Sequence, residues 1–362
     1  MWRSEIDTVQ SQHGYFREDA TARATSIRDV AAWSDSVKVN TANVYEFMAP
    51  EMARVDKTVR EAAKVDFPIV SALIRDIVSA GGKRLRPLLL LLSARGFDRN
   101  LDRAVVAAAG VELLHTASLV HDDNIDRSSL RRGQPTLNTQ VSSGAVILIG
   151  DYLFAQSAIL AAESNDPRVV KIFATSLAEI CDGQIRETLD AHRLDQTRDD
   201  YDRRIYGKTA ALFAGATEMG AVIAGAPENA IQQLRQFGTD LGMAFQIIDD
   251  VLDLREGTQV LGKPAGNDLR QGVITLPVMK FLETASPAQT ELVRQVVLGE
   301  ESDDTIIDRL IGEIRVSDAI GTAEAEAFGY IANARDRLEV VPDSETRAML
   351  VEVLQSAFDR SS

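Results

Sequence analysis

The chain has 362 residues, with 54 Asp and Glu against 39 Lys and Arg, which gives a formal net charge of −15 at pH 7. Because nucleic-acid backbones are held by an excess of basic side chains, this charge excludes a general nucleic-acid binder. Hydrophobic residues make up 45% of the chain, enough for a globular protein to bury a core. The single cysteine, Cys181, excludes an intrachain disulfide and favours a reducing, cytoplasmic location.

Residues 1–42 are polar and carry mixed charge, so we expect an N-terminal extension there and one domain over 43–362. No signal peptide or organellar transit peptide is indicated at this end. We also expect no transmembrane segment, because the densest apolar runs are too short or carry Glu112 and His115.

Along the rest of the chain, apolar residues recur three and four positions apart, which is the helical spacing. After early repeats such as Met52, Val55 and Val59, helical patterns cover about 104–126, 143–163, 168–191, 201–224 and 228–255. Alternating apolar and polar runs are nearly absent, and Asp182-Gly183 falls inside a helical pattern, so we do not predict a turn there. The sequence therefore predicts an all-α fold, a single large helical bundle.

Two aspartate clusters share one pattern, Asp-Asp-x-x-Asp. The first is Asp122, Asp123 and Asp126, and the second is Asp249, Asp250 and Asp253. On a helix, residues three and four apart face the same side, so each cluster gathers its carboxylates. Each also ends an apolar run, where the carboxylates need a counter-charge that hard divalent cations supply. Acid-rich helix faces are common in so acidic a chain, but two matching clusters favour a shared metal site.

Basic residues lie beside these clusters in an otherwise acidic chain. Lys83 and Arg86 stand at a predicted helix start, where unpaired N–H groups suit an anion. Further bases follow at Arg131-Arg132, in Gly207-Lys208-Thr209 and at Lys263. This combination is typical of polyphosphate binding through Mg²⁺. A P-loop nucleotidase is not favoured, because the Gly-x-x-x-x-Gly-Lys-Ser/Thr loop is absent from the sequence.

With these motifs in place, the chain resembles the trans-isoprenyl (polyprenyl) diphosphate synthase family. The resemblance spans about 80–280, over Gly81–Pro87, Glu112–Asp126 with Arg131–Gly133 and Pro135-Thr136, Gly150–Leu153, Lys208–Ala210, Phe245–Asp253 and Gly262–Pro277. It implies an isoprenoid-synthase bundle with a deep central cavity and a homodimer. It also implies about three Mg²⁺ ions per active site, for which Mn²⁺ can substitute.

The resemblance also implies roles for individual residues. The six aspartates would be catalytic, with Asp122, Asp126 and Asp249 as metal ligands. Isopentenyl diphosphate would be held by Lys83, Arg86, His115 and Arg132. The allylic diphosphate, farnesyl or geranylgeranyl, would be held by Arg131, Lys208, Thr209, Gln246 and Lys263.

The implied reaction is a head-to-tail (1'-4) condensation in three steps: ionisation, condensation and elimination. Metals and cations stabilise the departing allylic diphosphate, and the double bond of isopentenyl diphosphate attacks the allylic cation. A proton is then lost, and we expect the released diphosphate to accept it.

The chain departs from the family pattern at two points. Val273 stands where many relatives carry a Lys, which puts one diphosphate contact in doubt, and the basic C-terminal tail of many farnesyl diphosphate synthases is missing. The alternatives are a short-chain synthase, a terpene cyclase and a non-catalytic synthase subunit. The second Asp cluster disfavours a cyclase, and the complete aspartate set disfavours a non-catalytic subunit.

Product length is expected to depend on the residues four and five before Asp122, about one helical turn away at roughly 6–7.5 Å. In short-chain relatives bulky aromatics close the cavity here, whereas this chain has Ser118 and Ala117. Small residues also permit close helix packing, which is the competing explanation. We nevertheless predict a product longer than C20.

Overall fold

The computed structural model describes residues 41–79, 82–131, 133–255 and 265–356, and these lie in one compact unit, Val39–Ser362. The predicted all-α fold is confirmed. The first helices are α2 (Thr41–Phe47), α3 (Ala49–Ala62), α4 (Pro68–Ser79), α5 (Leu85–Arg95) and α6 (Asp102–Ile125). The middle of the chain forms α7 (Ser143–Glu163), α8 (Pro167–Asp190), α9 (Arg198–Ile205), η4 (Tyr206–Ala210), α10 (Ala211–Ile223) and α11 (Glu228–Arg255). The proposed extension, 1–42, lies almost wholly outside the described residues and stays a prediction.

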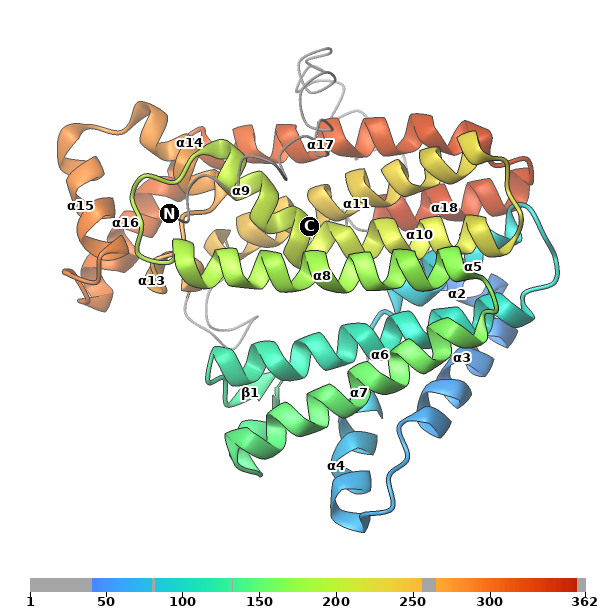
Figure 1. The fold of residues 1–362 in the computed structure, drawn as a ribbon. Coiled ribbons are helices and arrows are strands. Elements are labelled where there is room, and N and C mark those ends of the chain that lie inside the picture. The colour runs from blue at the N-terminus through green and yellow to red at the C-terminus, as the bar shows by residue number, and fades with distance from the viewer. Residues whose placement is uncertain (1–40, 80–81, 132, 256–264, 357–362) are drawn as a thin grey trace, which may run out of the picture. The chain divides into compact units, whose positions relative to one another are not determined.

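The last third of the chain forms α13 (Asn267–Arg270), α14 (Leu276–Thr284), α15 (Pro287–Val297), α16 (Asp304–Val316), α17 (Ala319–Arg337), η5 (Leu338–Val340) and α18 (Ser344–Ser356). The apolar stripe of α18 packs on α2 and α5, so the two ends of the described chain meet. Figure 1 shows α17 and α11 above α10 and α8, with α6 and α7 below them.

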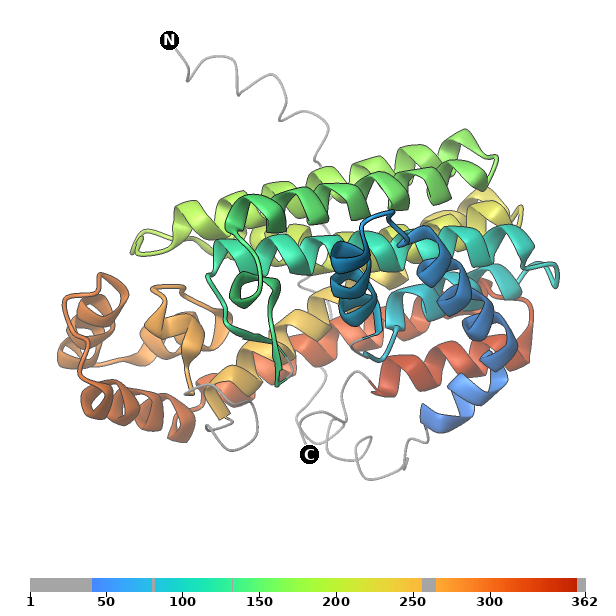
Figure 2. The ribbon, with the colours of Figure 1, turned by 90° about the horizontal axis from the view of Figure 1, so that it is seen from below.

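The helices that carry the site are buried at the centre of this bundle. Helix α10 packs against α5, α8 and α11, and α6 packs against α7 and α3. Figure 2 gives a second view in which α6 and α7 again lie side by side. Small residues permit the close α6–α7 contact, since a Cβ at Gly110 would lie 3.0 Å from the carbonyl oxygen of Ser157.

A short antiparallel strand pair, β1 (Leu130–Arg131) and β2 (Gln134–Pro135), follows α6 and was not predicted. Two residues per strand are too few to produce an alternating pattern in the sequence. Arg131, the second residue of β1, belongs to the predicted site. The hairpin therefore places a basic side chain beside the end of α6.

Two helices, α6 and α7, are long and apolar enough to cross a membrane by length and composition alone. The apolar window of α6 is 78% buried inside the bundle, as expected for the core helix of a globular protein. The window of α7 is only 39% buried, and Leu148 on this helix is 70% exposed. Helix α7 thus has an apolar face that the other described residues do not cover.

Candidate active site

The two aspartate motifs occupy the carboxyl ends of α6 and α11. The first motif fills the last turn of α6, where Asp126 is the C-terminal cap residue, and the second lies in the last two turns of α11. Asp123 and Asp250 are buried, Asp122, Asp249 and Asp253 are half-buried, and Asp126 is exposed. In each motif, the second aspartate is therefore the most buried of the three.

Hydrogen bonds from the protein hold the carboxylates of Asp123, Asp253 and Asp250. Arg131 donates its Nε to both carboxylate oxygens of Asp123, at 2.9 and 3.0 Å. The carboxylate of Asp253 accepts the backbone N–H groups of Asn267 and Asp268 at 3.2 Å each, and so fixes the start of α13. Two predicted site residues, Arg131 and Asp123, thus bind each other in this structure.

The third held carboxylate, Asp250, has donors on both oxygens. Gln246 Nε2 donates to Oδ1 at 2.9 Å, and the Tyr201 hydroxyl donates to Oδ2 at 2.7 Å. Thr209 Oγ1 in turn donates to Gln246 Oε1 at 2.6 Å. The predicted allylic-site residues Thr209 and Gln246 are therefore brought together with the second aspartate motif. Sequence reasoning missed Tyr201, which lies 49 positions from its partner and carries no local motif.

Burial and neighbouring negative charge raise the pKa of two aspartates. Burial raises the pKa of Asp122 to about 6, with Asp126 and Glu187 acting in the same direction and Lys208 opposing them. Burial also raises the pKa of Asp250 to about 8, with Asp268 adding to the effect. Carboxylates whose ionised form is this unfavourable gain from a bound cation, so their chemistry fits hard divalent metals.

Lys208 lies within electrostatic reach of the first motif and of Asp268 on α13. Its Nζ donates to both carboxylate oxygens of Glu187 at 2.6 Å, and its charge also interacts with Asp122 and Asp268. Burial alone would lower the pKa of Lys208, but Glu187 outweighs it, and the net shift is upward. Lys208 therefore stays cationic between α6 and α13. Sequence reasoning missed Glu187, because no motif marks a glutamate one turn beyond Gly183 on α8.

The predicted continuous helix over 201–224 is divided into α9, the π-helix η4 and α10, and η4 carries Lys208 and Thr209. A Cβ on Gly183 would lie 2.4 Å from the backbone nitrogen of Lys208, and a Cβ on Gly207 would lie 2.8 Å from the Cα of Gly183. Helix α8 and η4 therefore cross with their backbones in contact. Single π turns inside helices occur frequently at functional sites.

Two of the residues predicted to hold isopentenyl diphosphate, Arg86 on α5 and His115 on α6, lie together. Arg86 Nη1 lies 3.3 Å from His115 Nε2, and its guanidinium lies 4.4 Å from the ring centre of Phe213. Lys83 is exposed, and its carbonyl accepts the Tyr45 hydroxyl. The neighbouring Arg84 was not predicted as important. It pairs with the buried Glu112 on α6 and thereby fixes the loop.

The two residues predicted to set product length lie inside α6. Ala117 is fully buried, and Ser118 is buried with its hydroxyl donating to the His115 carbonyl at 2.8 Å. The deep cavity that these residues would line, and their effect on product length, stay predictions.

The structure does not describe two of the predicted site residues. Arg132 and Lys263 fall outside the described residues.

Among the described residues, no group of three or more His, Cys, Asp and Glu side chains is close enough to hold a metal ion on its own. Mg²⁺ in phosphate-binding sites keeps several waters and takes one or two carboxylates together with substrate oxygens, so it does not need such a group.

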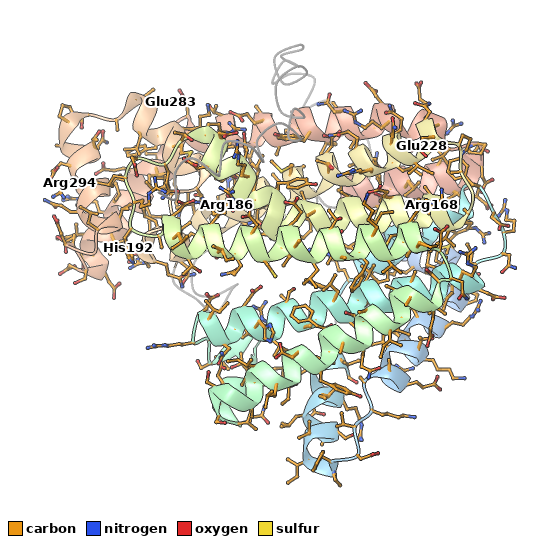
Figure 3. All side chains as sticks on the ribbon, viewed as in Figure 1. Arg168, Arg186, His192, Glu228, Glu283 and Arg294 are labelled. Carbon is orange, nitrogen blue, oxygen red and sulfur yellow. The ribbon has the colours of Figure 1, made fainter. Side chains whose placement is uncertain are left out.

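A groove of about 260 Å³ lies between α8, α10 and α11, away from the aspartate motifs. Figure 3 shows two of its charged residues, Arg168 and Glu228, at the same end of α8 and α11. Both basic and acidic side chains line it, and none of the predicted site residues does. The candidate active site therefore rests on the two motifs and not on this groove.

The chain is similar to known proteins in sequence and in fold. A family model described as polyprenyl synthetase matches residues 67–314. The chain is 38% identical to heptaprenyl diphosphate synthase component 2 of Geobacillus stearothermophilus, over 85% of this chain and 95% of that protein. It is 36% identical to an all-trans-nonaprenyl-diphosphate synthase of Rhodobacter capsulatus, described as geranyl-diphosphate specific, over 86% of this chain and 96% of that one.

Two solved structures are also similar. A decaprenyl diphosphate synthase from Rhodobacter capsulatus matches with a TM-score of 0.84 and 35% identity, and the match covers 89% of this chain and 100% of that one. A polyprenyl synthase from Caulobacter crescentus, complexed with calcium and isoprenyl diphosphate, has a TM-score of 0.85 at 33% identity, over 90% of this chain and 99% of its own. The chain belongs to the polyprenyl synthetase family, and the prediction of a polyprenyl diphosphate synthase is confirmed over the short-chain alternative.

Proposed function

We propose that the protein is a Mg²⁺-dependent prenyltransferase that extends an allylic diphosphate with isopentenyl diphosphate to a product longer than C20. The observation that carries this proposal is the position of Lys208, a cation within electrostatic reach of Asp122 on α6 and Asp268 beyond α11. A diphosphate with bound Mg²⁺ matches this arrangement, because its oxygens satisfy the lysine while its metals satisfy the carboxylates.

The metal ligands that we propose are Asp122, Asp126 and Asp249. Asp123, Asp250 and Asp253 complete the proposed catalytic set, and hydrogen bonds with Arg131, Gln246 and the start of α13 hold their carboxylates in place. The calcium in the Caulobacter crescentus synthase supports a divalent-metal site in the family. When bound, Mg²⁺ would supply the positive charge that stabilises the departing diphosphate.

For the two substrates we propose separate pockets. Lys208, the Thr209–Gln246 pair, Arg131 and Lys263 would hold the allylic diphosphate. Lys83, Arg86, His115 and Arg132 would hold isopentenyl diphosphate. The contact between Arg86 and His115 supports the second pocket, because it joins the start of α5 to the helix that carries the first motif.

A farnesyl or geranylgeranyl starter is part of the proposal, and so is a homodimer. Exposed apolar side chains on α7 and α8 support a second copy of this chain as the partner: Ile147, Leu148, Ile159, Ile185 and Leu189. Exposed apolar patches on a protein commonly mark the surfaces that bind a partner. The relatives named above are bacterial, and we propose a soluble, cytoplasmic enzyme.

The proposal is tested by Asp122→Ala and Asp249→Ala, assayed with isopentenyl diphosphate, an allylic starter and Mg²⁺. Each change should lower turnover more than about a hundredfold, because it removes transition-state charge stabilisation of order 3 kcal/mol. Circular dichroism should show unchanged helical content, and EDTA should stop the wild-type reaction until Mg²⁺ is restored. Near-wild-type turnover in either variant would show that the metal assignment is wrong.

A further inference from the structure

A buried chain of hydrogen bonds joins three elements behind the proposed allylic site. It runs from Thr209 on η4 to Gln246 and Asp250 on α11, and ends at Tyr201 on α9, with donor–acceptor distances of 2.6, 2.9 and 2.7 Å. Tyr201 is 0% exposed and is among the largest fully buried side chains of the described part. Its hydroxyl cannot touch a substrate.

The geometry of the structure gives the donor and acceptor roles along this chain. Gln246 turns its Nε2 toward Oδ1 of Asp250, where the amide N–H donates and the carboxyl oxygen accepts. Its Oε1 then faces Thr209, and the Thr209 hydroxyl must use its only proton for that bond. Thr209 therefore has no proton left for a diphosphate oxygen, unlike a residue that donates directly to the substrate.

The second oxygen of Asp250 explains why Tyr201 matters. Without the Tyr201 proton, one oxygen of a buried carboxylate would lack its donor, at a cost of roughly 1–3 kcal/mol. The carboxylate would then be free to turn, and the orientation of the Gln246 amide would no longer be fixed. Two arginines flank the Tyr201 ring at 5.5 and 5.9 Å, which restrains the ring itself.

We propose that Tyr201 is a positioning residue for the allylic diphosphate site, acting through Asp250 and Gln246 on Thr209 and on the π-helix that presents Lys208. This inference rests on the proposed function. It differs from a purely structural role for Tyr201, because it predicts an effect on one substrate and not on the other.

The test compares Tyr201→Phe with Tyr330→Phe at pH 8.5. Tyr330 is a half-buried phenol on α17 that forms no hydrogen bond with Asp250 in the described part of the chain, so its variant controls for the loss of a phenol hydroxyl. Tyr201→Phe should raise the KM for the allylic diphosphate at least fivefold and leave the KM for isopentenyl diphosphate within twofold. Tyr330→Phe should change neither value more than twofold.

A binding measurement provides a readout other than turnover. Isothermal titration calorimetry with an unreactive allylic thiolodiphosphate should show the same loss of at least fivefold for Tyr201→Phe. A second variant, Thr209→Val, should show a similar loss, and Thr209→Ser should restore wild-type binding. Combining Tyr201→Phe with Thr209→Val should add less than twofold to the effect of Thr209→Val, because both changes break one chain.

Equal changes in both KM values, wild-type binding by Tyr201→Phe, or additive losses in the double variant would overturn the inference. So would similar behaviour of Tyr201→Phe and Tyr330→Phe. Failure of the proposed function is a different result, because the wild-type protein itself would then form no prenyl product.

Discussion

At the scale of single residues, the two aspartate motifs contain carboxylates with different surroundings. Spacing alone predicts all six as one set, because residues three and four apart share a helix face. The structure adds partners from other segments, since Arg131 binds Asp123, Tyr201 binds Asp250 and the start of α13 binds Asp253. Such partners cannot be predicted from spacing, which explains why Tyr201 and Glu187 were missed while the motifs themselves were found.

The Glu187–Lys208 pair predicts how charge at the site controls anion binding. Glu187→Gln keeps a hydrogen-bond acceptor for Lys208 but removes the carboxylate that competes with a diphosphate. Metal-free binding of inorganic diphosphate should become about tenfold tighter, equivalent to about 1.4 kcal/mol. Isothermal titration calorimetry measures this effect.

Asp182→Asn is the matched control, because Asp182 is also on α8 and also paired, to Arg186. It removes the same charge from a more exposed position and should leave diphosphate binding unchanged. If the two variants behaved alike, the effect would come from net charge and not from Lys208.

The raised pKa values of Asp122 and Asp250 predict an unusual pH dependence of stability. Between about pH 4 and pH 8 the native state keeps protons that the unfolded chain has lost, so these two groups make the metal-free protein less stable as pH rises. Each unit of pKa shift corresponds to about 1.4 kcal/mol. Asp250→Asn should remove part of this loss.

Urea unfolding of the metal-free protein at pH 5 and pH 8 measures the difference. The free energy of unfolding of the variant minus that of the wild type should be more positive at pH 8 than at pH 5. A constant difference between the two proteins at both pH values would argue against a raised pKa at Asp250.

At the scale of elements, helical spacing predicted most of the bundle, including α7 and α11 at their observed bounds. It predicted helix over 201–224 but not the π turn within it, because the π turn of η4 depends on the contact of Gly207 with Gly183 on α8. That contact is long-range, and the sequence over η4 looks like ordinary helix. The same crossing places Lys208 beside Glu187, so the irregular turn and the site have one cause.

Gly183→Ala tests this crossing. The new Cβ would meet backbone atoms, which cannot turn aside, so we expect a loss of about 1–3 kcal/mol in unfolding free energy. The KM for the allylic diphosphate should rise as η4 is displaced. Chemical denaturation and steady-state kinetics check the two effects.

Gly321→Ala in α17 is the matched control, because open space surrounds its Cβ position. Alanine replaces glycine in a helix there, so stability should increase by up to about 1 kcal/mol. A Gly183→Ala protein with wild-type stability and KM would contradict the proposed backbone contact.

At the scale of the whole molecule, the exposed apolar face of α7 and α8 predicts an oligomer. Leu148→Glu places a charge on that face and should convert a dimer into a monomer, as measured by light scattering after gel filtration. Val316→Glu is the control, since Val316 on α16 is 87% exposed but lies outside that face. A wild-type monomer, or a Leu148→Glu dimer, would contradict the homodimer proposal.

The family and the all-α bundle could be predicted from the sequence because both depend on local motifs and helical spacing. Product length could not be settled in this way, because it depends on the space that several helices enclose. Ala117 and Ser118 are small, but both are buried within α6. Only the product itself shows whether they border the growing chain.

The most direct test of the account is the product that the purified protein forms from radiolabelled isopentenyl diphosphate, Mg²⁺ and a farnesyl or geranylgeranyl starter. We predict chains longer than C20, and a shorter product from Ala117→Phe with activity retained, because the new ring would fill the path of the chain and not the metal site. A wild-type product that stops at C15 or C20 would contradict the long-chain assignment.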